Sequence, residues 1–189
     1  MKYLLFTTLL TLCFSSPVKA EYMLNKDVTH YSVNESDPSK LLAEVTKVMK
    51  KPCKSRSRNP VFSCMLGSVK ATHKSIEVGK GVCGIYRFKL VAKQHYLIPK
   101  WVNRGQHSIE MQNKWIDLLN DRTERAQHHG KIFKKSMLKA HDRIMKLTTL
   151  CSKVTRSISK ILDKAQEEAQ EEYKEFYKES GDSIGNFPN

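Results

Sequence analysis

A change of hydrophobic period near residue 108 is the feature that most constrains the fold. From this point apolar residues recur every three or four positions, which is the spacing of an amphipathic helix and not of a strand. The first predicted helix contains the stretch from Trp115 to Asp142. A second carries the same spacing from Ile144 to Phe176, with Gly181 as its expected C-terminal cap. Two long helices of this kind must bury their apolar faces against each other or against a sheet.

The segment before residue 108 favours strands, because apolar and polar residues alternate in several short runs. One helix interrupts these runs: Asp37 is its expected N-cap, Pro38 is its first residue, and it extends to about Lys50. The expected strands cover residues 27–33, 61–69, 81–91 and 96–99, and Pro99 confines the last to an edge or an end of the sheet. The predicted fold is α+β, with an N-terminal strand and helix, a small antiparallel sheet and two long C-terminal helices.

The first twenty residues have the pattern of a secretory signal peptide. Lys2 is followed by an apolar run over residues 4–14 and by small residues at the usual cleavage positions before Glu21. The apolar run is shorter than the roughly 20 residues that a membrane-spanning helix needs. We therefore expect a signal peptide over residues 1–20, a single domain over 21–181 and a flexible tail over 182–189. The protein should be exported to the periplasm or secreted, with no transmembrane segment after signal removal.

Four of the five cysteines follow this leader, and an even number in an exported chain predicts two disulfides. Four cysteines allow three connectivities. We favour Cys53 with Cys64, which closes a local basic loop, and Cys83 with Cys151, which ties a strand to the last helix. A zinc site built from these cysteines is disfavoured, because none of them forms a C-x2-C pair.

The chain is strongly basic, with a formal net charge of +14. A basic surface can meet nucleic acid or anionic lipid head groups, but we find no nucleic-acid motif and expect no nucleic-acid partner. A solvated basic face near an anionic envelope is the favoured interpretation. Lys131, Lys134 and Lys135 on the first long helix are the expected contacts for an anionic partner.

Adjacent histidines at the centre of this helix make it the candidate site for metal chemistry. A zinc protease helix has the sequence His-Glu-x-x-His, whose two imidazoles hold the ion while the glutamate acts as base. Ending that motif at His128 places Glu124 at the first histidine and Arg125 at the base; ending it at His129 places Arg125 and Ala126 there. No catalytic residue is therefore assigned. Glu124, His128 and His129 remain candidate zinc ligands, although a structural or surface role is favoured for each.

Several short motifs are spread along the chain from about Thr29 to Gly185. They are Tyr31-Ser32-Val33 ahead of the capped helix with Leu41 and Leu42, Gly81-Val82-Cys83-Gly84-Ile85, Leu97-Ile98-Pro99-Lys100-Trp101, Trp115, Leu150-Cys151 and Tyr177. In this combination the chain resembles a family of small secreted bacterial zinc-dependent proteases, long catalogued as a domain of unknown function. The resemblance implies a zincin-like α+β domain.

In that family the helix after the tryptophan bears His-Glu-x-x-His, and a late Tyr-Asp-x-x-Thr-x-His-Gly segment closes the domain. Here the late segment, from Tyr177 to Gly185, has no histidine. The resemblance implies zinc as cofactor and a peptide or protein as substrate. Because both motifs are changed, we expect hydrolysis to be impaired or lost. The alternative is a non-catalytic envelope or surface binding protein with a basic face for anionic partners.

Overall fold

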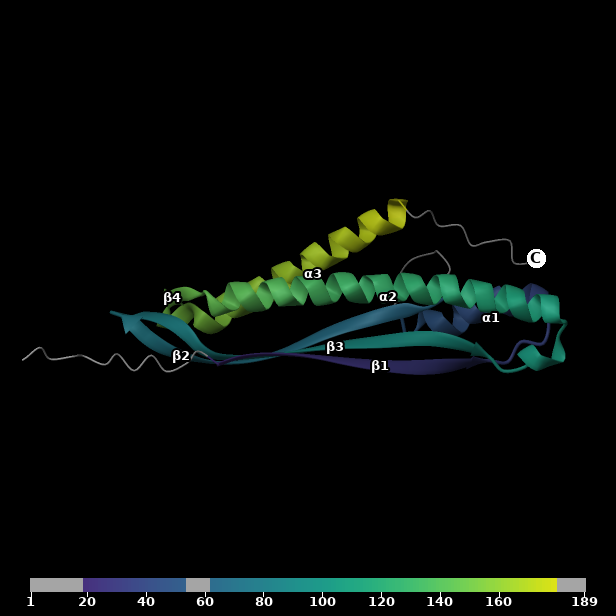
Figure 1. Ribbon diagram of the computed structural model, residues 1–189, viewed down its shortest axis with the longest axis horizontal. Helices are drawn as coiled ribbons and strands as arrows, with labels where there is room; N and C mark the ends of the chain where they lie inside the picture. The colour runs from purple at the N-terminus through teal and green to yellow at the C-terminus, as the bar shows by residue number, and fades with distance from the viewer. Residues whose placement is uncertain (1–18, 54–61, 180–189) are drawn as a thin grey trace, which may run out of the picture.

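A computed structural model describes residues 19–53 and 62–179, and it confirms the α+β fold class (Figure 1). The elements follow one another as β1 (Lys19–Val33), α1 (Pro38–Lys50), β2 (Cys64–Gly79), β3 (Val82–Trp101), η1 (Arg104–Gln106), α2 (Ile109–Met145), β4 (Thr148–Leu150), η2 (Cys151–Lys153) and α3 (Val154–Glu179). Most of the expected signal peptide, the cap Gly181 and the tail over 182–189 lie outside the described residues. None of the described helices is long and apolar enough to cross a membrane.

The sheet is mixed, and not purely antiparallel as the sequence suggested. Its strand order is β1-β3-β2, and the short β4 pairs with the start of β3. β2 and β3 form an antiparallel hairpin whose turn contains Gly81 at φ 69°, a conformation that favours glycine. β1 is parallel to β3, with Lys19 opposite Arg87 and Val33 opposite Trp101. The chain reverses once through α1 and again at the hairpin, so the third strand runs in the direction of the first.

Three of the four predicted strands correspond to observed strands, but they were too short. β1 begins at Lys19 and not near residue 27, and β2 continues to Gly79. The separate strand expected over 96–99 is wrong, because β3 runs unbroken from Val82 to Trp101. A polar run around Gln94 hid this continuity, although the Gln94 side chain is only 1% exposed.

The first helix begins at its expected cap and the next near the expected residue 108, but one break was missed. The Asp37 carboxylate accepts a hydrogen bond from the Ser39 N–H at 2.9 Å, and Ser108 caps α2. Helical spacing continues from Ile144 through Cys151, yet the chain leaves the helix there to form β4 and η2. In that segment the Cys151 N–H donates to the Gly81 carbonyl at 2.9 Å. Pairing with β3 therefore overrides local helical preference.

Both disulfides join the cysteine pairs favoured from the sequence. Cys53 is bonded to Cys64, and Cys83 is bonded to Cys151 across 68 residues of sequence. The second bond ties β3 to η2, immediately before α3, and so fixes the point from which α3 departs.

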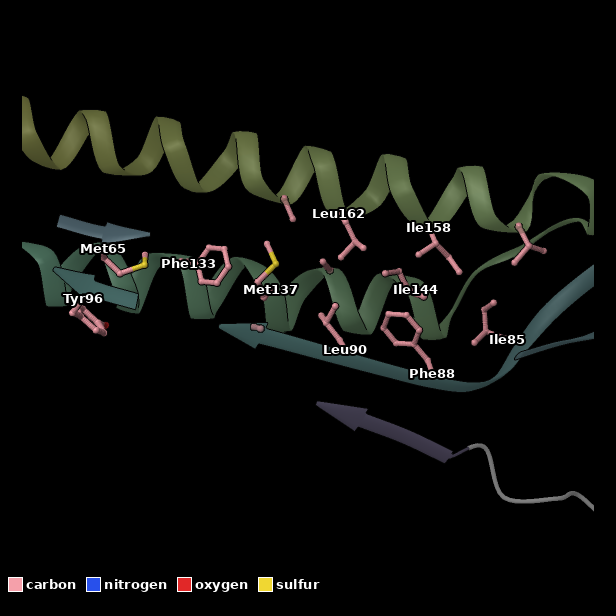
Figure 2. Close-up of a cluster of buried hydrophobic side chains, with 14 of the residues drawn as sticks. Met65, Ile85, Phe88, Leu90, Tyr96, Phe133, Met137, Ile144, Ile158 and Leu162 are labelled. Atoms are coloured by element: carbon pink, nitrogen blue, oxygen red, sulfur yellow. The ribbon is translucent and has the colours of Figure 1, made fainter. Parts of the chain in front are cut away.

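The main core lies between one face of the sheet and the two long helices. α2 runs along the length of the sheet, and α3 returns along α2 (Figure 1). Figure 2 shows side chains of β3 such as Phe88 and Leu90 pointing towards α2, while Ile158 and Leu162 of α3 point towards α2 from the other side. The helices and sheet thus bury one continuous apolar cluster.

A second core lies at the end of the molecule where α1 is seen in Figure 1. Its strand members include Leu97, which alternates with Tyr96 and Ile98 of the main core and therefore belongs to the opposite face of the sheet. α1 contributes Leu41, Val45 and Met49, all 0% exposed. α1 therefore packs over one end of the sheet together with the beginning of α2, whose Trp115 and Leu118 belong to the same cluster.

Candidate functional site

The middle of α2 is packed closely against the sheet. The carbonyl of Gly130 accepts a hydrogen bond from Gln94 Nε2 at 2.5 Å, and the Tyr96 hydroxyl donates to Gln94 Oε1 at 3.0 Å. A Cβ atom at Gly130 would collide with the Tyr96 hydroxyl. Ala126, one turn earlier, is 4% exposed. Small residues at these two positions therefore let the helix approach the sheet closely enough for the glutamine to bond the helix backbone.

The two adjacent histidines point to α3 and not to a common centre. The His128 ring stacks on Phe176 and the His129 ring stacks on Tyr173; in each pair the centroids are 3.9 Å apart and the planes differ by 16°. Figure 1 shows α3 diverging from α2 towards its C-terminal end, which is where these residues lie. The four rings therefore fill the space that opens between the helices.

His129 is the more strongly perturbed of the two groups. Burial lowers its pKa from 6.5 to about 4, and the charge of His128 beside it contributes further in the same direction. The ring is therefore neutral at physiological pH. A neutral ring in flat contact with Tyr173 has the character of a packing group.

The remaining predicted ligand, Glu124, is exposed to solvent. Arg125, which falls at the base position of a motif ending at His128 and at the first histidine of one ending at His129, has its guanidinium 3.3 Å from a carboxylate oxygen of Asp121. Ala126, the base position of a motif ending at His129, is buried. In residues 19–53 and 62–179, no three His, Cys, Asp or Glu side chains come together to hold a metal ion.

These residues do not fit a zinc site. A catalytic zinc needs three protein donors whose lone pairs converge on one point. Here the rings of His128 and His129 pack on different aromatic partners. Among the described residues the carboxylate of Glu124 belongs to no group of three possible ligands. The guanidinium of Arg125 would also repel a cation. We therefore assign no chemical step to zinc in this chain.

The aromatic partners of the histidines were missed by sequence reasoning. Tyr173 and Phe176 are three residues apart on α3, and they were assigned only to its apolar stripe. An aromatic pair at helical spacing opposite a His-His pair was the available signal. It could not be used without knowing how α2 and α3 align.

The basic face predicted on α2 is only partly free. Lys131 and Lys134 are exposed, and within the described ranges neither has an ion-pair partner. Lys135 instead pairs with Glu172 of α3 at 2.9 Å. The three lysines therefore do not act as one uniform patch.

A second basic surface lies on α3 and was not singled out in the sequence. Its members are spaced three or four residues apart on the solvent side, three of them on α3 and Lys153 at the end of η2 just before it, and we call them the α3 basic stripe: Lys153, Arg156, Lys160 and Lys164. All four are exposed, whereas Val154, Ile158 and Leu162 form the opposite, buried side. None of the four pairs with an acid in the part of the chain that the structure describes.

The position of this stripe works against helix stability. A helix N-terminus carries a partial positive charge, so cations are unfavourable there. The first turn of α3 contains no acid, and apart from Asp163 the acidic residues gather in the second half, beginning at Glu167. The charge order along α3 is therefore the reverse of the one that stabilises a helix. This indicates that the basic residues serve binding and not the stability of the fold.

Comparison with known families gives one match. The profile of a family described as "Bacterial protein of unknown function (DUF922)" matches residues 28–183. No curated protein and no solved structure matches the chain. The matched range includes β1 from Val28 onwards and every later element, from α1 to α3.

Proposed function

Because the chain belongs to this bacterial family, we propose that it is a non-hydrolytic binding protein that acts outside the cytoplasm. In this proposal the α3 basic stripe docks on an anionic surface of the cell envelope. The observation that supports the proposal best is the stripe itself, whose four exposed cations lie on one side of α3 and of the turn before it and have no ion-pair partner among the described residues.

The resemblance to secreted zinc-dependent proteases supports the extracytoplasmic setting and accounts for the shared architecture. A signal-like leader and two disulfides agree with an oxidising compartment. Loss of hydrolysis is supported by Arg125 and Ala126 at the positions of the missing histidine and base, and by the stacking of both histidines on α3. The scaffold is retained while the residues of the reaction are replaced.

The stripe is long enough for several simultaneous contacts with an anionic surface. From Lys153 to Lys164 it spans about 16 Å, at 1.5 Å per residue. Each basic residue near an anionic membrane contributes about 1 kcal/mol, so four contribute about 4 kcal/mol at low salt. A dissociation constant in the millimolar range would thus fall roughly a thousandfold, into the micromolar range.

The test is binding of the purified protein to vesicles of an anionic phospholipid, with neutral vesicles as reference. We expect binding that falls steeply as salt rises from about 50 to 200 mM. Reversing three charges of the stripe, Lys153→Glu, Lys160→Glu and Lys164→Glu, should abolish it. The matched control reverses three exposed lysines elsewhere, Lys26→Glu, Lys50→Glu and Lys100→Glu, and should keep most of the binding.

Equal loss in both triple variants would show that net charge alone drives adsorption, and would contradict the assignment to α3. Binding that does not change with salt would contradict the electrostatic basis. A third variant, Lys131→Glu with Lys134→Glu, separates the α2 lysines from the α3 basic stripe. It should bind more strongly than the α3 variant.

A further inference from the structure

A groove lies on the sheet near the start of β1, at the opposite end of the sheet from α1. It is lined by side chains of the three long strands, among them Lys19 of β1, Thr72 and Lys74 of β2, and Arg87 and Lys89 of β3. Lys19, Lys74 and Arg87 are exposed. No residue of the α3 basic stripe and no histidine of α2 takes part.

Three of these cations form one row across the sheet. Arg87 is directly opposite Lys19 on one side and directly opposite Lys74 on the other. Residues paired in this way point to the same face with Cβ atoms about 5 Å apart, so the three charges repel one another. We call Lys19, Arg87 and Lys74 the cation row.

Within the part of the chain that the structure describes, the row has no counterion. The acid that lines the groove, Glu21, pairs with Lys89 at 3.0 Å in the next row. In the described residues no carboxylate pairs with a member of the cation row, and Arg87 makes only a cation–π contact with Tyr86 at 5.7 Å. Like charges placed opposite one another in register are costly unless an anion lies between them.

We propose that this groove binds the phosphate group of a small phosphorylated molecule. A guanidinium offers two parallel N–H donors to a phosphate, and lysines on either side add charge-assisted hydrogen bonds. A phosphate monoester carries nearly two negative charges at neutral pH, which suits three cations better than a single carboxylate does. The Thr72 hydroxyl, also in the groove, supplies a further donor.

Removal of the expected signal peptide after Ala20 keeps the charge of the groove. Cleavage would remove Lys19 but create the α-ammonium group of Glu21, one row away on the same strand. The pKa of an α-amino group is about 8, so this group is mostly charged at neutral pH. The groove therefore keeps a cation on β1 before and after cleavage. Because it contains no residue of the α3 basic stripe, phosphate binding here does not depend on the envelope-docking function.

The test is a titration of the purified protein with pyrophosphate and with glycerol phosphate at constant ionic strength, followed by calorimetry or NMR. We expect saturable binding with one site, which acetate at the same concentration does not displace. Arg87→Gln should weaken binding at least about tenfold, the order expected for a lost hydrogen bond to a charged group. Lys74→Gln should weaken it to a smaller extent.

The matched control is Lys93→Gln, a lysine on the same strand and the same face of the sheet that does not line the groove. It should bind the ligand like the unmodified protein. Equal weakening in Arg87→Gln and Lys93→Gln, or the absence of saturable binding, would overturn the proposal. Vesicle binding by Arg87→Gln should stay unchanged, so failure of this site and failure of the envelope-docking function give different results.

Discussion

Replacing His129 by phenylalanine should make the protein less sensitive to acid. The pKa of His129 is lowered by burial to about 4 in the folded protein, against 6.5 for the free group. Between these values the unfolded chain binds a proton that the folded chain does not bind. Stability therefore falls as the pH falls from about 6.5 towards 4, and it changes little above or below this window. Phenylalanine keeps a flat ring against Tyr173 but binds no proton.

The size of the effect follows from the two pKa values. At pH 5 the difference in proton binding destabilises the folded protein by about 2 kcal/mol, given 1.36 kcal/mol for each pKa unit. Water that reaches the ring reduces this figure, so about 1 to 2 kcal/mol is expected. The assay is urea unfolding followed by circular dichroism at pH 7.5 and pH 5. The unmodified protein should lose that amount of stability at the lower pH through His129, and His129→Phe should not.

His30→Phe serves as the control, because His30 is an exposed histidine on β1. It should keep the pH dependence of the unmodified protein. If His129→Phe shows the same loss between pH 7.5 and pH 5 as the unmodified protein, then the ring is not the buried, neutral packing group described above.

Three further changes test the packing and the charge of the fold by urea unfolding. Gly130→Ala should destabilise by about 1 to 3 kcal/mol, because the added methyl group collides with the Tyr96 hydroxyl, whereas Gly105→Ala, which meets no atom within 4 Å, should be nearly neutral. Replacing both Cys83 and Cys151 by serine should cost about 4 kcal/mol, since that bond closes a loop of 68 residues, against about 3 kcal/mol for Cys53 and Cys64 with 11. Arg87→Gln should stabilise by up to about 1 kcal/mol, because it relieves repulsion from Lys74 and from the cation on β1, which is Lys19 or, after cleavage, the α-ammonium group of Glu21; a loss of stability would contradict the cation row.

Local signals predicted the elements whose ends are set by nearby residues. Asp37 and Ser108 begin helices because each side chain accepts a bond from an N–H two or three residues later. The extent of β3 was missed because Gln94 is polar in sequence and buried in the fold, where it bonds Gly130 from another element. The break after Met145 was missed for the same kind of reason, since Cys151 leaves the helix to bond Gly81.

In the candidate site, too, local features could be predicted from the sequence and contacts between elements could not. That the zinc motif lacks its glutamate can be seen from Arg125 and Ala126 alone. The flat contacts of His128 and His129 depend on how α2 and α3 align, which no local pattern specifies. The cation row depends on strand register, because Lys19, Lys74 and Arg87 come from distant segments. Sequence spacing found the residues of one element, and tertiary pairing decided which of them meet.

The central claim is that the His-His helix is a packing element in a chain that does not hydrolyse peptides. Zinc content measured after dialysis, beside hydrolysis of a generic protein substrate, tests it most directly. The unmodified protein and a Glu124→Ala, His128→Ala, His129→Ala variant should retain equally little zinc and show no hydrolysis above buffer. One equivalent of zinc in the unmodified protein, lost from the variant together with hydrolysis, would contradict the account.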